Sequence, residues 1–205
     1  MSIKDLTQKL LANFGITLIK LNKTDLINQL NREKRIIQTP LGIETLYSLV
    51  KSAGKIEGDI VEVGVYKGGS AKIICEAKEN KVLHLFDTFE GFPKPTEVDD
   101  NTFSEGEFKE SLENVKQYLI EYENVYFYKG VFPNTAQEVE DKHFSFVHLD
   151  VDLHKGTLDC LKFFYPRMNI GGMIISHDYP FKWVRDAFEE FFKDKPEPII
   201  LITRS

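Results

Sequence analysis

The stretch IVEVGVYKGGSAKIICEAKENKVLHLFD, residues 60–87, decides the fold class, because it combines two short apolar runs with a glycine-rich turn and a helix. The runs 60–65 and 82–87 are rich in β-branched and apolar residues, which is typical of buried strands. The helix between them is predicted to begin at Gly68-Gly69. A strand that leads through one helix into the next strand is the unit from which parallel sheets are built.

The rest of the chain repeats this alternation. Further strands are predicted over residues 124–130, 144–152, 171–178 and 198–203, and helices over residues 108–122, 135–141, 157–168 and 182–192. Another helix is predicted to begin after Thr39-Pro40, where threonine can cap and proline is tolerated, and to end at Gly54. We therefore expect an α/β fold: a doubly wound, mostly parallel, Rossmann-like sheet with helices on both faces.

The first 38 residues differ from this pattern, since they show helical spacing without strands. Leu6, Leu10, Leu11 and Phe14 recur at the intervals of one helix face. We expect a helical extension or lid over residues 1–38 and one α/β domain over residues 39–205.

Composition excludes several classes of partner. The 205 residues carry a net charge of −6, which argues against a nucleic-acid-binding surface. The apolar runs are too short to span a bilayer, and the N-terminus lacks the apolar core of a signal peptide. Cys75 and Cys160 lie in apolar segments, as expected for buried thiols in a reducing compartment. We expect a cytoplasmic protein with no membrane span.

The glycine-rich turn is a candidate ligand site. Gly64, Gly68 and Gly69 follow the first strand, where a backbone without Cβ lets a ligand approach closely. Glu62 lies within the strand end, an unusual place for an acid unless a polar group meets it. The spacing G-x-x-x-G-G differs from the dinucleotide-binding G-x-G-x-x-G and from a P-loop. A tight turn without a ligand is the alternative.

Asp87 ends the second strand, about twenty residues beyond the turn, where an acid can accept hydrogen bonds from a ribose diol. A turn or helix-capping aspartate is the alternative interpretation. Together, the turn and Asp87 indicate an adenosine-type ligand. Since no phosphate-binding motif is present, S-adenosylmethionine fits better than NAD or ATP.

Two neighbouring strand ends carry acids and a histidine. Asp150 and Asp152 end the strand over 144–152, and His177-Asp178 ends the next strand. Like charges in one small volume are unfavourable unless a cation binds or one acid is protonated. We expect a divalent metal bound by Asp150, His177 and Asp178. The alternative is that the acids cap helices and the histidine lies on the surface.

These segments together resemble the macrocin O-methyltransferase family, metal-dependent class I methyltransferases that methylate sugar hydroxyls of natural products. The resemblance covers roughly residues 39–193, and its most specific parts are DTFEGFP (87–93) and LDVDL (149–153) with the T…L…YPR…GG pattern that follows. It implies a class I methyltransferase domain over 39–205. The expected function is methylation of a hydroxyl of a sugar or glycosylated small molecule, dependent on S-adenosylmethionine and a divalent metal.

The resemblance also implies roles for single residues. The expected cofactor-binding residues are Glu62, Gly64, Gly68, Gly69 and Ser70 at the methionine end, Asp87 at the ribose, and Thr88 and Phe89 near the adenosine. The expected metal ligands are Asp150, His177 and Asp178, and the expected general base is Asp152.

Two departures from the family pattern bear on the chemistry. His177 stands where the family usually has a carboxylate, which shifts the expected metal from Mg²⁺ toward Mn²⁺, Fe²⁺ or Zn²⁺, or weakens the site. Leu153 stands where catechol-type relatives carry a lysine, so a lysine base is not expected. A noncatalytic S-adenosylmethionine-binding homologue and an NAD-dependent oxidoreductase are the alternatives. A homo-oligomer is compatible with the apolar N-terminal helices.

Overall fold

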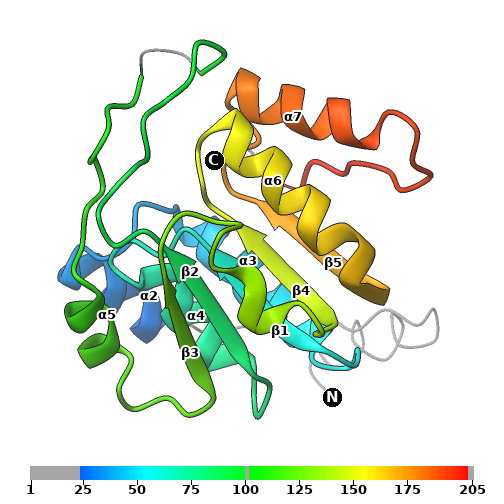
Figure 1. The fold of residues 1–205 in the computed structure, drawn as a ribbon. Helices are drawn as coiled ribbons and strands as arrows, with labels where there is room; N and C mark the ends of the chain where they lie inside the picture. Colours follow the sequence, from blue (N-terminus) through cyan, green and yellow to red (C-terminus); the bar gives the residue numbers. More distant parts are fainter. Residues whose placement is uncertain (1–23, 100–101, 203–205) are drawn as a thin grey trace, which may run out of the picture.

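The sheet has the predicted parallel topology. The structure, a computed structural model, describes residues 24–99 and 102–202. In these ranges five parallel strands pair in the order β3-β2-β1-β4-β5 (Figure 1). Their bounds are β1 (Asp59–Val63), β2 (Leu83–Asp87), β3 (Val125–Lys129), β4 (Phe144–Leu149) and β5 (Met168–Ser176). The chain builds outward from β1 in both directions, so the strand order reverses between β1 and β4, which confirms the doubly wound α/β fold.

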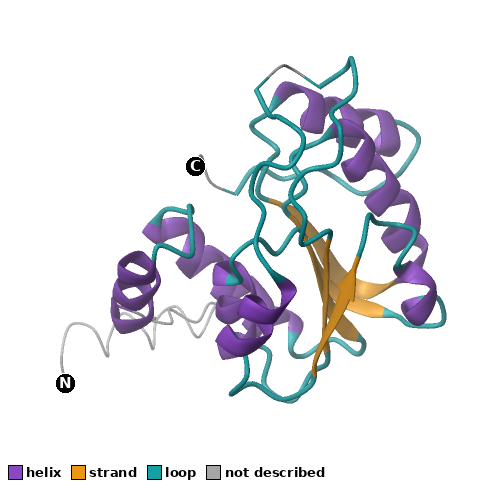
Figure 2. Ribbon diagram, turned by 60° about the vertical axis from the view of Figure 1, so that its left-hand side comes forward, coloured by secondary structure: helices purple, strands orange, loops and turns teal. Residues whose placement is uncertain are grey.

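Helices cover both faces of the sheet, which Figure 2 shows nearly edge-on. Those whose apolar side chains join the first core cluster are α2 (Thr24–Glu33), α3 (Pro40–Ala53), α4 (Gly69–Ala77) and α5 (Leu112–Tyr118). Those that join the second cluster, across the sheet, are η1 (Ala136–Val139), α6 (His154–Phe164) and α7 (Lys182–Phe192). A short 3-10 helix, η2 (Tyr165–Arg167), links α6 to β5. None of the helices in the described ranges is long and apolar enough to cross a bilayer.

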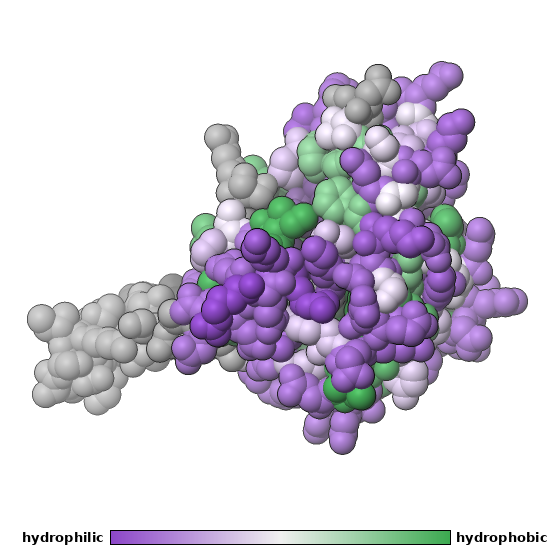
Figure 3. All heavy atoms as spheres, turned by 90° about the vertical axis from the view of Figure 1, so that its left-hand side faces the viewer, coloured by the Kyte–Doolittle hydropathy of each residue, from purple (hydrophilic) through white to green (hydrophobic). Residues whose placement is uncertain are grey.

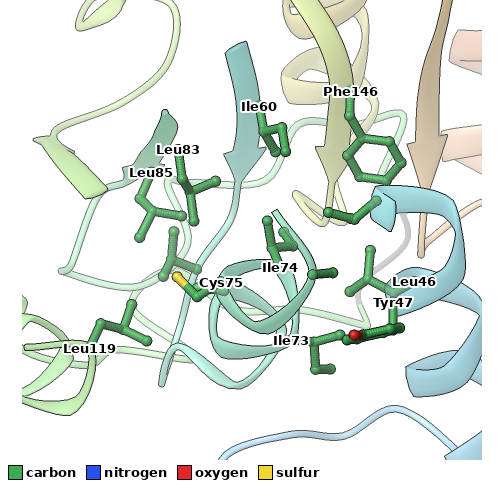
Figure 4. Packing of buried hydrophobic residues seen from close by; sticks show 14 of the residues in the cluster. Leu46, Tyr47, Ile60, Ile73, Ile74, Cys75, Leu83, Leu85, Leu119 and Phe146 are labelled. Atoms are coloured by element: carbon green, nitrogen blue, oxygen red, sulfur yellow. The ribbon is translucent and has the colours of Figure 1, made fainter. Parts of the chain in front are cut away.

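Side chains along a strand point to opposite faces of the sheet and so join different core clusters. Ile60 of β1 joins the first cluster, whereas Val61 and Val63 join the second. Figure 4 shows α4 with Ile73 and Ile74 among the apolar side chains of the first cluster. Because both faces are covered, the strands read as continuous apolar runs, and this is why their positions could be predicted.

Several element ends differ from the prediction for local reasons. The helix expected over 108–122 spans only Leu112–Tyr118, because Phe108 has a φ of 57° and Ser111 caps the helix by accepting the N–H of Asn114. The segment 135–141 forms only the 3-10 helix η1. Thr39 caps α3 as predicted, accepting the N–H of Gly42 at 3.2 Å. Leu6, Leu10, Leu11 and Phe14 lie outside the described residues.

The strand predicted over 198–203 is wrong as far as residue 202, where the description ends. Residues 198–202 are exposed and have no strand conformation. In the described part of the chain β5 is the last strand on its side of the sheet, and residues 198–202 form no ladder with it. The apolar run IILI thus misled the prediction, because a strand also needs a paired edge.

Gly64 marks the contact between β1 and β4 at the point where strand order reverses. It has a φ of 88°, and a Cβ placed there would lie 1.8 Å from the carbonyl oxygen of Asp150. The close approach of two backbones, therefore, requires glycine at this position. Because Asp150 is a candidate ligand, the same contact fixes one side of the site.

We predict that Gly64→Ala lowers the free energy of unfolding by at least about 3 kcal/mol, from the positive φ and the clash with β4 together. Gly106→Ala is the matched control, since Gly106 has a φ of 82° but no atom within 4 Å of the added Cβ. The control is expected to cost about 1 kcal/mol. Urea denaturation of both variants measures the difference, and equal losses would contradict the account of Gly64.

Candidate active site

A cavity of about 410 Å³ lies beyond the C-terminal ends of the strands, where strand order reverses. Eight predicted site residues line it: Gly64, Ser70, Asp87, Thr88, Asp150, Asp152, His177 and Asp178. The other four, Glu62, Gly68, Gly69 and Phe89, do not line it. The fold thus brings together residues that are more than 100 positions apart in the sequence.

Gly68 and Gly69 serve packing within the chain. A Cβ on Gly68 would lie 3.2 Å from Val115 Cγ1 of α5, and one on Gly69 would lie 2.4 Å from the carbonyl oxygen of Arg35. The backbone of the segment before α3 thus lies in close contact with the turn at Gly69. Protein neighbours therefore require glycine at these two positions, and a role of either residue in binding a cofactor stays a prediction.

Asp87 organises the turn and faces the cavity. Its Oδ2 accepts the N–H groups of Val65 (2.7 Å) and Tyr66 (2.9 Å), and its Oδ1 accepts the N–H of Phe89 (2.7 Å). Tyr66 and Phe89 both have positive φ, which these bonds hold in place. A carboxylate has about four lone-pair sites, and the three N–H groups use three of them, so capacity is left for one ligand hydroxyl.

Glu62 lies behind the turn and is paired with a histidine from the neighbouring strand. Register places Glu62 of β1 beside His148 of β4, and Oε1 lies 2.8 Å from His148 Nδ1. Burial raises the pKa of Glu62, and the contact with His148 opposes this shift. Glu62 Oε2 is buried without a hydrogen bond, while the Ser70 hydroxyl lies close enough to lower the pKa. Ser70 in turn lines the cavity, so Glu62 contacts a residue of the cavity wall without lining the cavity itself.

Asp150, His177 and Asp178 form a compact set of donor atoms. One ligand atom from each lies within 4.8 Å of the other two. His177 Nδ1 is 3.4 Å from Asp150 Oδ1 and 3.3 Å from Asp178 Oδ1. Two carboxylates and one imidazole are donors that Mn²⁺, Fe²⁺ and Zn²⁺ accept readily, and Mg²⁺ less so. The chemistry of this donor set fits a divalent cation, and binding of a metal here stays a prediction.

Without a metal, the proton on His177 supplies the positive charge. Contacts with Asp150 and Asp178 raise the pKa of His177 to about 10. Burial would raise the pKa of Asp150, but the hydrogen bond from His177 and the charges of His148 and His177 together outweigh it, so this pKa is lowered. Burial and the charge of Asp150 raise the pKa of Asp178 to about 6. Burial and the charges of Asp178 and Asp150 raise the pKa of Asp152 to about 9.

These pKa values predict that the metal-free protein loses stability as pH rises. Between about pH 7 and 9 the folded state holds protons on Asp152 and His177, whereas unfolding releases them, because both folded-state pKa values are raised above their unfolded values. Stability is therefore greatest below this window and falls through it, by at most about 1.4 kcal/mol per pH unit for each such proton. Urea denaturation in EDTA measures the slope. Asp152→Asn should flatten it, and a slope that is zero or positive in the wild type would contradict this charge distribution.

The loop over residues 91–111, of which residues 100 and 101 lie outside the description, supplies residues that the motifs did not reveal. Phe92, Phe103 and Phe108 form ring contacts with centroids 5.0–6.3 Å apart, and all three line the cavity. Asp99 of the loop accepts the N–H of His154 at 2.7 Å, capping α6. The only signal in the sequence for this aromatic cluster is the recurrence of phenylalanine at positions 92, 103 and 108.

The mouth of the cavity is apolar. Its lining includes Ile37, Phe108 and Val131, which are 71%, 40% and 45% exposed. Figure 3 shows the face that carries α2, α5 and the loop, where apolar side chains gather in one area below the loop within a mostly hydrophilic surface. An apolar rim around a polar floor is typical of small-molecule sites.

Comparison with known proteins adds evidence from outside the chain. Residues 42–203 match the family model described as Macrocin-O-methyltransferase (TylF). Among curated relatives, Mycinamicin III 3''-O-methyltransferase of Micromonospora griseorubida is 28% identical over 179 residues, covering 76% of this chain and 70% of the relative. A tetracenomycin-C 4'-O-methyltransferase of Streptomyces olivaceus, whose name gives a substrate with a dimethoxy-rhamnosyl group, is 28% identical over 156 residues, covering 68% of this chain and 59% of the relative.

A solved structure agrees in fold. The O-methyltransferase NovP superposes with a TM-score of 0.66 at 25% sequence identity, covering 79% of this chain and 76% of that one. The parallel sheet with helices on both faces is therefore shared with an O-methyltransferase of known structure.

Proposed function

Because this chain belongs to the macrocin O-methyltransferase family, we propose that it methylates a hydroxyl on the sugar of a glycosylated small molecule. S-adenosylmethionine is the proposed methyl donor, and a divalent metal at Asp150, His177 and Asp178 the proposed activator. The Streptomyces olivaceus relative acts on a rhamnosyl-bearing compound, according to its name.

One observation carries the proposal. A single cavity is lined by Asp87, by the three-residue donor set and by Asp152. Asp87 suits a ribose, and the donor set suits a cation and substrate oxygens. A methyl donor and a hydroxyl acceptor must meet in one space for direct transfer, and the cavity offers sites for both.

The residues of the chain have separate tasks. Asp87 would hold the ribose diol, and Ser70, backed by Glu62, would meet the methionine end. When bound, S-adenosylmethionine supplies an electrophilic methyl group, and a divalent metal supplies Lewis-acid activation of a hydroxyl. Asp152 would accept the hydroxyl proton. Its raised pKa makes its ionised form a stronger base than an ordinary carboxylate, and a cation in place of the His177 proton favours that form.

The apolar mouth supports a particular kind of acceptor. The sugar would enter the polar floor, whereas the rim at Ile37, Phe108 and Val131 would contact the aglycone. We therefore propose a glycoside with an apolar aglycone in preference to a free sugar.

The family match favours methyl transfer over the two alternatives from the sequence. An NAD-dependent oxidoreductase would be expected to carry the dinucleotide-binding spacing G-x-G-x-x-G, whereas the turn at Gly64, Gly68 and Gly69 has the spacing G-x-x-x-G-G. A degenerate metal site would lack a close donor set, whereas the three donor atoms here lie within 4.8 Å of one another.

The test is isothermal calorimetry with S-adenosylhomocysteine, NAD and MnCl₂, followed by transfer of radiolabelled methyl groups to a panel of glycosides. We expect binding of S-adenosylhomocysteine but not NAD, and methyl transfer that stops in EDTA and returns with Mn²⁺ or Mg²⁺. Transfer at full rate in EDTA would remove the metal from the proposal. Binding of NAD in preference to S-adenosylhomocysteine would overturn the proposal as a whole.

A further inference from the structure

Asp152 has a backbone conformation that L-residues rarely adopt. Its φ is 56°, and the N–H of Leu153 donates to the carbonyl oxygen of Val151 at 2.6 Å, which closes a γ-turn around it. Such turns with positive φ are rare and strained. Strain of this kind persists only where surrounding contacts hold it.

Two side chains from another part of the chain hold both peptide groups of Asp152. Asp178 Oδ2 accepts its N–H at 2.9 Å, and the indole Nε1–H of Trp183 donates to its carbonyl oxygen at 2.6 Å. Asp178 belongs to the donor set already described. Trp183, in the first turn of α7, does not line the cavity and touches Asp152 only from behind.

The Trp183 ring is itself fixed by aromatic packing. It stacks on Phe181 with a centroid distance of 5.1 Å and meets Phe103 of the 91–111 loop edge-on at 6.4 Å. The side chain is 8% exposed. An indole is a donor without an acceptor, and when buried it needs a partner; here that partner is the Asp152 carbonyl. Phenylalanine would keep an aromatic ring in this position but has no N–H to hold the turn.

We propose that Trp183 is a positioning residue for methyl transfer: its indole N–H holds the Asp152 γ-turn so that the carboxyl group of Asp152 faces the acceptor hydroxyl in the cavity. The inference rests on the proposed role of Asp152 as proton acceptor. Trp183 touches neither cofactor nor acceptor and acts through the backbone of Asp152.

The first test compares Trp183→Phe with Phe188→Leu. Phe188 is a buried residue of the same helix that does not line the cavity, so its variant controls for lost packing. Trp183→Phe is expected to lower kcat at least 10-fold, with the acceptor KM and the Kd for S-adenosylhomocysteine within about two-fold of wild type. Phe188→Leu should lower Tm but leave kcat within about two-fold. Wild-type kcat in Trp183→Phe, or a parallel loss of S-adenosylhomocysteine affinity, overturns the proposal.

The second test needs no acceptor. Trp183 is the one tryptophan of the sequence, so ¹⁵N-labelled protein gives a single indole cross-peak. Its N–H should exchange with solvent at least 100-fold more slowly than a free indole. Titration with MgCl₂ should also move the peak, because Asp178, a proposed metal ligand, accepts the N–H of Asp152, the residue whose carbonyl oxygen Trp183 contacts. Rapid exchange overturns the Trp183 proposal. Slow exchange without any shift on adding Mg²⁺ or Zn²⁺ keeps the Trp183 contact and counts against the metal site.

Discussion

Replacing Asp152 with asparagine is expected to lower kcat for methyl transfer by about 10²–10⁴-fold, the usual contribution of a general base. The amide has nearly the same shape, so the γ-turn and its bonds from Asp178 and Trp183 can form, but it cannot take up the acceptor proton. The Kd for S-adenosylhomocysteine should stay within about two-fold of wild type, because Asp152 lies on the acceptor side of the cavity.

Asp141→Asn is the matched control for this variant, since Asp141 is an exposed acid before the other end of β4. It should leave kcat unchanged. Steady-state rates with radiolabelled S-adenosylmethionine measure both variants. If Asp152→Asn kept more than a tenth of the wild-type rate, another group would have to accept the proton.

The second large effect is expected at Asp87. Asp87→Ala should weaken binding of S-adenosylhomocysteine by about 10–100-fold, because one hydrogen bond to a charged acceptor is lost at about 1.5–3 kcal/mol. The same substitution frees the N–H groups of Val65, Tyr66 and Phe89, so the turn also loosens.

Two controls separate ribose recognition from damage to the turn. Glu90→Gln changes an exposed acid three residues away that pairs with Lys109 and Lys129 and does not line the cavity. Its Kd should match the wild type. An S-adenosylhomocysteine analogue without the two ribose hydroxyls should bind the wild-type protein weakly. Its affinity for Asp87→Ala should be only slightly lower than its affinity for the wild type. If the analogue bound wild type as tightly as S-adenosylhomocysteine does, Asp87 would have no role at the ribose.

The strand ends could be predicted from the sequence because a parallel sheet collects them at one edge. Each of Asp87, Asp150 and His177-Asp178 follows an apolar run, and the fold brings all of them to one cavity. The alternation of strands and helices is enough to predict this edge, because the carboxyl ends of parallel strands lie together whatever the strand order is.

Contacts between distant residues could not be predicted in the same way. Asp99 reaches His154 across 55 positions, and Phe103 meets Trp183 across a still longer separation. The pairing of Glu62 with His148 depends on the register of β1 and β4, which no local pattern specifies. Gly64 was expected to make room for a ligand, and it also makes room for the backbone of Asp150.

His177 differs from the family pattern, and this difference changes the charge of the donor set. A histidine in place of a carboxylate lets the donor set balance its charge with a proton when no metal is bound. Because the proton and a metal compete for the same nitrogen, metal affinity should rise with pH.

The most direct test of the central claim is calorimetric titration of the wild-type protein with MnCl₂ and S-adenosylhomocysteine at pH 8, repeated with Asp150→Asn. The account predicts one Mn²⁺ and one S-adenosylhomocysteine per chain in the wild type, and in Asp150→Asn a loss of Mn²⁺ binding with S-adenosylhomocysteine binding retained. Equal Mn²⁺ binding by both proteins, or no S-adenosylhomocysteine binding by either, would contradict it.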